Sequence, residues 1–201
     1  TVILKKDQSI HIDDDIIAVD GVQISTKQQY YIKFHKPAGY ITAVEDPTHP
    51  VVMDLLPPEF KKMGVFPVGR LDKDTEGLLL LTNDGIWAHS IINGHKHVPK
   101  VYYVEFNGKL TKDGVERIET GIVLGDGTQC KPATIDVLSD RSLHITIEEG
   151  KYHQVKRMIG AAGGEVTYLK RLSIGHITLN GIEAINTYSE IADQDVVDFK
   201  K

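Results

Sequence analysis

The chain has 201 residues, of which 41% are hydrophobic and 25% are charged, and its formal net charge is −5. This length predicts one main domain with at most a small appendage, and a core large enough to need no disulfide. The single cysteine, Cys130, excludes an intrachain disulfide and a multi-cysteine zinc site, and it is typical of a reducing, cytoplasmic compartment. No apolar run approaches ~18 residues, so we expect neither secretion nor a membrane span.

The first 28 residues are expected to be the end of a separate small domain followed by a linker, because they are too few to fold alone. They contain two predicted short strands, at 9–12 and 16–19, and then a turn at Asp20–Gly21. Because the chain starts at Thr1, we expect that a further part of the protein precedes it. The main domain is then expected to span residues 29–201.

The first half of the main domain is predicted to combine strands with irregular loops. A strand at 30–34 leads towards a proline-rich loop at 45–58, which one short helix around 52–56 interrupts. Strands at 65–68 and 78–81 flank a polar turn. Asp84 is then placed to cap a helix over 86–92.

The second half contains more strands, separated by isolated helices. The predicted elements are a strand at 101–106, a helix from Thr111 to about 122, a hairpin turn at 125–127, strands at 133–138 and 143–148, a helix over 152–162, and strands at 166–169 and 174–179. Strands interrupted by isolated helices predict an α+β fold with a mixed sheet, and not a regular parallel α/β fold.

The charges are distributed unevenly along the chain. Residues 150–176 hold five basic side chains and one acidic one, whereas 183–198 hold five acidic side chains and no lysine or arginine. A negative total argues against nucleic-acid binding, but such asymmetry can still steer an anionic ligand to one face. A chance distribution of surface charge would look the same, so the charges alone leave both interpretations open.

The polar turn at 69–77, with the sequence Gly-Arg-Leu-Asp-Lys-Asp-Thr-Glu-Gly, is the most informative segment of the chain. The glycine at each end lets the backbone bend sharply, so the turn presents Asp72 beside Arg70 between two predicted buried strands. A nucleophile would be accessible there. The turn also begins like a calcium-binding EF-hand loop, but the twelfth position, which needs a bidentate glutamate, is Asn83. We therefore expect no bound metal.

Two further segments carry chemistry-bearing side chains: Lys-Val-Tyr-Tyr-Val at 100–104 and Gly-Lys-Tyr-His-Gln-Val-Lys-Arg-Met at 150–158. Taken singly, each of the three segments has a structural explanation, namely an aspartate that caps a turn, a core tyrosine and solvated helix cations. Together they resemble, in order and spacing, the pseudouridine synthases, and in particular the RsuA type that modifies bacterial small-subunit ribosomal RNA. The resemblance runs from about 30 to 179, with Lys151 where the family often has arginine.

The resemblance implies a role for several residues. Asp72 would be the nucleophile, Tyr102 the active-site tyrosine and Lys156 the basic partner of Asp72. Leu172 would be the apolar residue that packs against the target base. The resemblance also implies a mixed, mainly antiparallel sheet with flanking helices and a central cleft, and it makes residues 1–28 the remnant of a small N-terminal RNA-binding domain.

The implied chemistry is consistent with these residue types. Converting uridine to pseudouridine breaks the glycosidic bond, turns the base and joins its carbon 5 to the sugar, so no redox step and no cofactor is expected. A carboxylate can attack the sugar or the ring, or remove a sugar proton. Lys156 would keep Asp72 ionised and oriented. The base must first leave its stack, and stacking on Tyr102 would return ~1–3 kcal/mol.

The expected partner is ribosomal RNA, bound by a monomer and without a small-molecule cofactor. Arg70 is placed to hold a phosphate or to wedge into the space that the flipped base leaves. The other cations expected along the RNA path are Lys100, Arg157, Arg171 and the cluster His95-Lys96-His97. Two alternatives remain open: the same chemistry on large-subunit RNA, and a non-catalytic module that binds ribosomal RNA during ribosome assembly.

Overall fold

The computed structural model describes residues 17–19, 22–24, 29–93 and 96–199. Its main body is a single nine-stranded sheet. The path through the sheet is β11 (Tyr188–Glu190), β3 (Tyr31–Lys36), β5 (Glu76–Thr82), β9 (Gly164–Ile174), β6 (Lys100–Gly108), β8 (Ser142–Ile147) and β7 (Thr134–Ser139), with β4 (Phe66–Val68) paired to β5 and β10 (Ile177–Thr178) paired to β9. Among these described strands only β5 and β9 run parallel, which confirms the predicted mixed, mainly antiparallel sheet.

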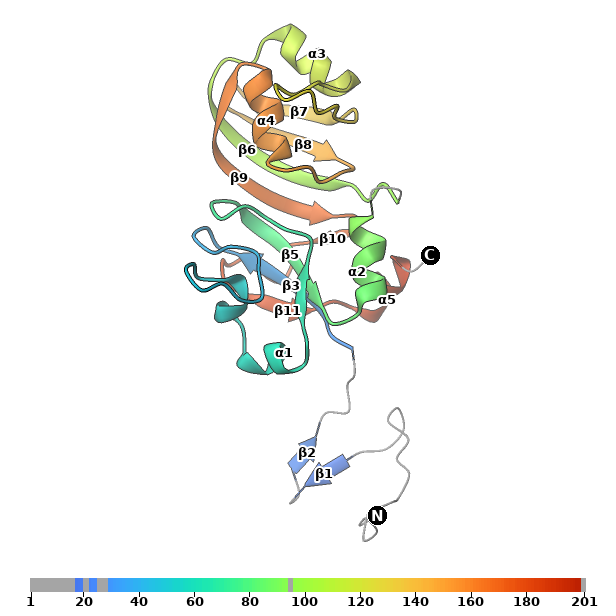
Figure 1. Ribbon diagram of the computed structural model, residues 1–201. Coiled ribbons are helices and arrows are strands. Elements are labelled where there is room, and N and C mark those ends of the chain that lie inside the picture. The colour runs from blue at the N-terminus through green and yellow to red at the C-terminus, as the bar shows by residue number, and fades with distance from the viewer. Residues whose placement is uncertain (1–16, 20–21, 25–28, 94–95, 200–201) are drawn as a thin grey trace.

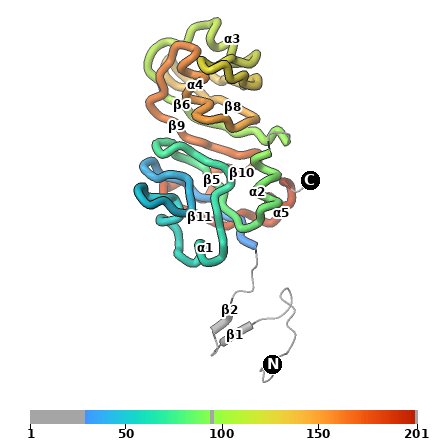
Figure 2. The backbone as a smooth tube through the Cα atoms, in the orientation of Figure 1, coloured from blue at the N-terminus to red at the C-terminus, as the bar shows by residue number. Residues whose placement is uncertain are grey.

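The helices flank this sheet at both ends. They are η1 (Val52–Leu55), α1 (Pro58–Lys62), α2 (Gly85–Ile92), α3 (Lys112–Thr120), α4 (Gln154–Ala161) and α5 (Asp193–Asp198). Helices α3 and α4 lie with β6–β9, whereas α2 and α5 lie beside the half that contains β3 and β5 (Figure 1). The chain path in Figure 2 brings β11, near the C-terminal end, next to β3 from the first half of the chain. No helix within the described ranges has the length and apolarity that crossing a bilayer requires.

Strand β5 is the centre of the core because both of its faces are covered. Leu79 and Leu81 pack into the larger apolar cluster, and Leu78 and Leu80 pack into a second one on the other face. All four leucines are fully buried. A strand covered on both faces is expected to be a continuous apolar run and not an alternating one, which explains the sequence of four leucines.

The sheet is narrowest where its two halves meet. Strands β5 and β9 pair at only two positions, Glu76 with Lys170 and Gly77 with Arg171. Gly77 has a φ of 107°, and a Cβ there would lie 2.2 Å from the carbonyl oxygen of Arg171, so only glycine fits. The turn that precedes β5 is therefore held at the junction between the two halves of the sheet.

Several predicted elements are confirmed with their caps. Asp84 accepts hydrogen bonds from the backbone N–H groups of Ile86 and Trp87, each at 3.0 Å, and begins α2. Thr111 accepts one from Gly114 N at 2.9 Å and begins α3. Cap residues of these types satisfy amide groups that have no partner inside the helix.

Other predictions need correction or lie outside the described residues. The two strands predicted at 166–169 and 174–179 are instead one long strand, β9, followed by the short β10. Helix α1 begins at Pro58, within the segment predicted as loop, because proline is tolerated in the first turn of a helix. The predicted strand at 9–12 lies outside the described residues, whereas β1 (Ile17–Val19) lies within the one predicted at 16–19 and pairs with β2 (Val22–Ile24).

Candidate active site

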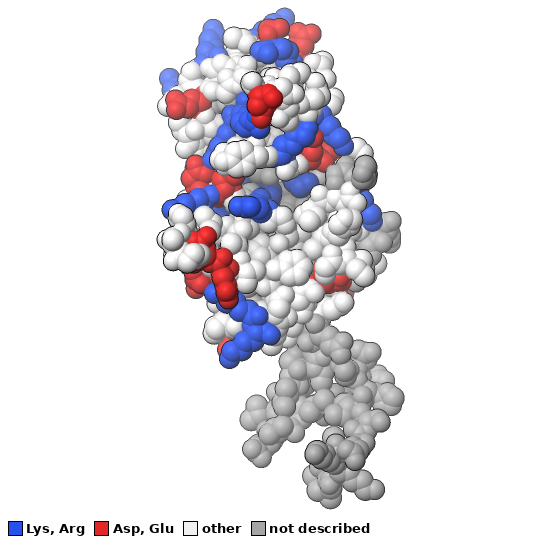
Figure 3. Space-filling view, viewed as in Figure 1, with Lys and Arg blue, Asp and Glu red and all other residues white. Residues whose placement is uncertain are grey.

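A cavity of about 410 Å³ opens at the junction between the two halves of the sheet. Its lining comes mainly from the turn between β4 and β5, the facing parts of β6 and β9, and the loop that leads into α4. Ile91 and Ile92 of α2 and Ile147 of β8 also line it. Figure 3 shows Lys and Arg side chains around the middle of this face, with carboxylates next to them. The residues that line the cavity include Arg70, Leu71, Asp72, Lys100, Tyr102, Tyr152, His153, Leu169 and Arg171.

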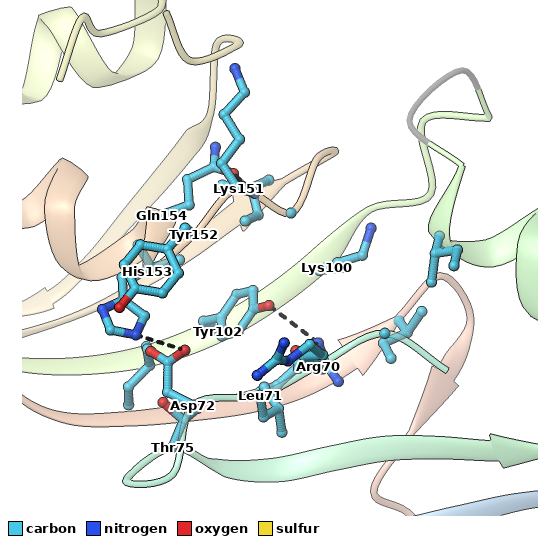
Figure 4. Close-up of a pocket in the computed structure, with 18 of the residues that line it drawn as sticks. Arg70, Leu71, Asp72, Thr75, Lys100, Tyr102, Lys151, Tyr152, His153 and Gln154 are labelled. Atoms are coloured by element: carbon cyan, nitrogen blue, oxygen red, sulfur yellow. Dashed lines mark hydrogen bonds and ion pairs between the residues drawn. The ribbon is translucent and has the colours of Figure 1, made fainter. Parts of the chain in front are cut away.

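Asp72 lies at the edge of this cavity on the predicted turn. The backbone N–H of Thr75 donates to Asp72 O at 3.1 Å, which closes the turn. Its Oδ2 lies 3.1 Å from the ammonium of Lys156, and its Oδ1 lies 3.4 Å from Nε2 of His153. Figure 4 shows the Asp72 carboxylate pointing towards His153. The side chain is 26% exposed, so the carboxylate is oriented by its neighbours and still open to a ligand.

Lys156, on the first turns of α4, holds two carboxylates. It donates to Asp74 at 2.6 Å and pairs with Asp72. Burial works against both charges, but the ion pairs outweigh it: they raise the pKa of Lys156 and hold the pKa of Asp74 below its usual value. The ammonium therefore stays charged beside Asp72 throughout the neutral range. Lys156 contacts Asp72 and is not itself among the residues that line the cavity.

Sequence reasoning gave no role to His153 and Tyr152, which the structure places at the cavity. His153 has a left-handed backbone, with a φ of 46°, an uncommon conformation for a residue other than glycine. Its ring stacks on that of Tyr152 with centroids 3.8 Å apart, and Tyr152 is 76% exposed. The sequence signal that could have found this pair is the adjacent Tyr-His at 152–153 beside the basic residues of the same segment, whereas the exposure of Tyr152 is known only from the structure.

Tyr102 reaches the cavity from β6. It is buried, and its ring lies between Asp72 and Lys100 in the view of Figure 4. Nη1 of Arg171 donates to its hydroxyl at 3.4 Å, and the guanidinium carbon lies 5.9 Å from the ring centroid. Of the three side chains predicted to act together, Asp72 and Tyr102 line one cavity, and Lys156, which does not line it, contacts Asp72.

The remaining predicted residues divide into two groups. Arg70, Lys100 and Arg171 line the cavity. Arg157 and Leu172 do not: Arg157 pairs with Asp126 at 2.5 Å, and the leucine that lines the cavity is Leu169. Side chains alternate along a strand, so Leu169 and Arg171 face the cavity and Leu172 does not. Of the cluster at 95–97, His95 lies outside the described residues, and His97 contacts Glu148 at 3.0 Å.

Lys36, at the end of β3, supports the backbone of the turn that carries Asp72. Sequence reasoning gave no indication of this buried side chain. Its fully buried ammonium donates to four backbone carbonyls, those of Thr75 at 2.7 Å, Pro37 at 2.9 Å, Asp72 at 3.1 Å and Lys73 at 3.4 Å. Burial lowers the pKa of Lys36 to about 8, although Asp74 and Asp72 favour the charged form. One buried cation therefore holds the backbone that presents Asp72.

Replacing this cation is expected to loosen the turn. Lys36→Met keeps the length of the side chain but leaves buried carbonyls without donors, so we expect a loss of about 2–4 kcal/mol in the free energy of unfolding. Urea unfolding at pH 7 measures it. Lys33→Met is the matched control, because Lys33 lies on the same strand and donates to Asn180 O in an exposed position. Equal losses in the two variants would contradict the supporting role of Lys36.

The difference in stability between wild type and Lys36→Met should also depend on pH. Between pH 8 and the ordinary value of 10.5, the folded protein has lost the Lys36 proton and the unfolded chain has kept it. Folding releases that proton, so the contribution of Lys36 rises with pH by at most about 1.4 kcal/mol per unit. We expect the difference to grow between pH 8 and pH 10. A difference that falls or stays constant over this range would contradict the depressed pKa.

The arrangement suits nucleophilic or proton-transfer chemistry on a small planar group. It offers an oriented carboxylate, cations on two sides, an aromatic ring and the apolar wall residues Leu71 and Leu169. Within the described ranges, no group of three or more His, Cys, Asp or Glu side chains is placed to hold a metal ion.

Comparisons with known proteins give a consistent result. The family model of RNA pseudouridylate synthases matches residues 30–161, a range that includes Asp72, Tyr102 and Lys156. The chain is 41% identical over 197 residues to the uncharacterized RNA pseudouridine synthase YtzG of Bacillus subtilis strain 168, covering 95% of this chain and 82% of that protein. It is 37% identical over 186 residues to ribosomal small subunit pseudouridine synthase A of Escherichia coli K12, covering 90% and 78%.

A solved structure is similar as well. A crystal structure described as a pseudouridylate synthase superposes with a TM-score of 0.77 at 32% sequence identity, covering 85% of this chain and 74% of the other. The similarity in sequence and the similarity in fold therefore each extend over at least 85% of the chain.

Proposed function

Because this chain belongs to the RNA pseudouridylate synthase family, and is therefore a pseudouridine synthase, we propose that its cavity converts a specific uridine of bacterial 16S ribosomal RNA to pseudouridine. The observation that carries the assignment of the site is the Asp72 carboxylate, held 3.1 Å from Lys156 at the edge of a cavity that Tyr102 also lines. The small-subunit target is supported by the similarity to the Escherichia coli enzyme named for that subunit.

Asp72 is the reacting group in this proposal. Three routes use its carboxylate: attack on the anomeric carbon of the sugar, attack on the uracil ring, or removal of a sugar proton. Each needs an ionised carboxylate with a free oxygen lone pair. The ammonium of Lys156 lies 3.1 Å from one carboxylate oxygen, His153 lies 3.4 Å from the other, and the side chain remains partly exposed to the cavity.

Tyr102 and Leu169 form the binding site for the extruded base. The ring of Tyr102 stacks against the extruded uracil, which offsets part of the few kcal/mol that unstacking costs. Its hydroxyl assists the final removal of the proton from carbon 5. Leu169 takes the packing role that the sequence analysis gave to Leu172, because it is the leucine that faces the cavity.

The RNA path follows the cations around the opening. Arg70 contacts a phosphate or fills the space left by the flipped nucleotide, since its guanidinium pairs with phosphate oxygens in a bidentate manner. Arg157, outside the cavity, contacts the RNA backbone at the rim. Exposed Tyr152 offers a stacking surface for a neighbouring base. Residues 1–28, as the remnant of a small N-terminal RNA-binding domain, add further contacts to the RNA.

The proposal includes the setting of the reaction. The enzyme acts in the cytoplasm, as a monomer and without a cofactor, on 16S ribosomal RNA or an assembly intermediate of the small subunit. Large-subunit RNA is the second candidate substrate, because the same cavity chemistry applies to any extruded uridine. A non-catalytic role in ribosome assembly would need no ionised carboxylate in the cavity.

Purified protein and two unmodified transcripts, of small-subunit and of large-subunit ribosomal RNA, separate these alternatives. After incubation, each RNA is digested to nucleosides, and pseudouridine is quantified by chromatography. We expect about one pseudouridine per small-subunit transcript and background levels in the other. Formation only in large-subunit RNA would contradict the target. Formation in neither RNA, nor in assembly intermediates of either subunit, would contradict the catalytic assignment.

A further inference from the structure

Arg171 is more deeply buried than a residue that merely guides RNA needs to be. Its side chain is 3% exposed, and it projects from β9 at the junction of the sheet. Its Nε donates to Leu78 O on β5 at 2.7 Å, which anchors the base of the guanidinium. Only weaker contacts hold its outer part: Nη1 lies 3.5 Å from Arg70 O and 3.4 Å from the hydroxyl of Tyr102.

The remaining nitrogen of this guanidinium has no acceptor. Nη2 is buried and makes no hydrogen bond within the described part of the chain. Arg171 also forms no ion pair with any described carboxylate. A buried, uncompensated charge is costly, and an arginine cannot lose its proton to relieve the cost. Because Arg171 lines the cavity, an acceptor that binds there would offset this charge.

A second cation shares this part of the cavity. Lys100 lines the same wall and donates to Val98 O at 3.0 Å. Burial, and to a smaller extent the neighbouring charge of Arg171, lowers the pKa of Lys100 to about 8. Arg171 also disfavours the charged form of Lys36. Positive charge thus gathers on one side of the cavity, and the carboxylate of Asp72 lies with Lys156 and His153 at the edge.

Building on the proposed function, we propose that Arg171, with Lys100, binds the carbonyl oxygens of the uracil ring and stabilises the negative charge that the ring carries while it is detached from the sugar. This assigns Arg171 a catalytic contact in place of a general role along the RNA path. It also explains why Nη2 is left without a protein partner.

The step has a simple electron balance. The bond between ring N1 and the anomeric carbon breaks, and its electron pair stays on the ring, where it is delocalised onto the two carbonyl oxygens. Asp72 replaces the ring at the sugar, either by forming a bond to the anomeric carbon or by accepting the proton from carbon 2′. When carbon 5 then bonds to the anomeric carbon, the ring's electron pair forms the new bond. At the same time the bond to Asp72 breaks and its electrons return to the carboxylate, or, in the other route, Asp72 returns the proton to carbon 2′. The proton on carbon 5 then leaves to a base. Hydrogen-bond donors aimed at such developing charge are typically worth 10²–10³ in rate.

The competing explanation is structural: Arg171 would only tie β9 to Leu78 on β5. The two explanations predict different rate losses when the leaving group, the uracil ring, is made more stable. Fluorine at carbon 5 withdraws electrons and stabilises the detached ring, so a substrate with 5-fluorouridine needs less help from a cation. A purely structural loss would slow uridine and 5-fluorouridine equally.

The test measures single-turnover loss of the N-glycoside in small-subunit transcripts made with uridine or with 5-fluorouridine. For Arg171→Gln we expect a loss of about 100-fold or more with uridine and at most about 10-fold with 5-fluorouridine. Arg171→Lys, which keeps the charge, should recover part of the uridine rate. The quantity compared is the ratio of the rate with uridine to the rate with 5-fluorouridine. Lys100→Met should lower this ratio as Arg171→Gln does, but by a smaller factor, and it removes no bond between strands. Lys151→Met, which removes a lining cation from the loop that leads into α4, is the control and should leave the ratio unchanged.

Each outcome decides the matter. An unchanged ratio in both Arg171→Gln and Lys100→Met would overturn the inference and leave Arg171 as a structural tie. If Arg171→Gln does not fold, as judged by circular dichroism, the ratio for Lys100→Met decides alone. A wild-type protein that converts neither RNA would contradict the proposed function itself, and this inference with it.

Discussion

Asp72→Asn is expected to abolish turnover and leave RNA binding almost unchanged. The amide has nearly the shape of the carboxylate but carries no charge, so it can neither attack the sugar nor accept a proton. Loss of a group that reacts directly with the substrate typically costs at least about 10³-fold in kcat. Tritium release from small-subunit RNA labelled at carbon 5 of uracil measures turnover, and filter binding of the same RNA should give a Kd within about threefold of wild type.

Asp74→Asn is the matched control for this experiment. Asp74 carries the same charge two residues along the turn and pairs with the same ammonium at 2.6 Å, but it does not line the cavity. We expect a loss of less than about tenfold, because only the environment of Lys156 changes. Equal losses in the two variants, or continued release from Asp72→Asn, would remove Asp72 from the chemistry.

Lys156→Met is expected to lower kcat by about 10²–10³ and to change the affinity for RNA little. The substitution removes the ammonium that lies 3.1 Å from Oδ2 of Asp72 and leaves two neighbouring carboxylates facing each other without a cation. Lys156→Arg should recover part of the activity, because it restores the charge with a different geometry. Steady-state kinetics of tritium release separate the effects on kcat and KM.

Arg157→Met tests whether any cation on this helix would have the same effect. Arg157 is the next residue of α4, but it pairs with Asp126 and not with Asp72. We expect a higher KM, which reflects weaker RNA binding, and a kcat close to wild type. A fall in kcat for Arg157→Met as large as that for Lys156→Met would mean that general positive charge, and not the contact to Asp72, is what matters.

Local patterns were enough to predict the elements around the site. The four leucines of β5, the glycines at the ends of the turn and the cap residues Asp84 and Thr111 each act through neighbouring residues, so their effects can be inferred from short windows of sequence. The three segments that hold Asp72, Tyr102 and Lys156 were likewise recognisable because each has a distinctive local composition, and the fold brings them to one cavity.

Residues whose roles depend on tertiary contacts were not predictable in this way. Lys36 looks like an ordinary strand-end lysine, and only the fold reveals that it is buried against three carbonyls of the turn, those of Asp72, Lys73 and Thr75. The leucine of β9 that lines the cavity is Leu169 and not the predicted Leu172, because the side of β9 that faces the cavity depends on its register with β6, which contains bulges. The unpartnered nitrogen of Arg171 is likewise invisible without coordinates.

A structure of the protein trapped on small-subunit RNA that carries 5-fluorouridine at the modified position is the most direct test of the whole account. It should show the fluorinated ring inside the cavity, against Tyr102 and Leu169, with the sugar or the ring within bonding reach of Asp72. A ring bound outside the cavity, or one beyond the reach of Asp72 and near another nucleophile, would contradict the central claim that this carboxylate carries the reaction.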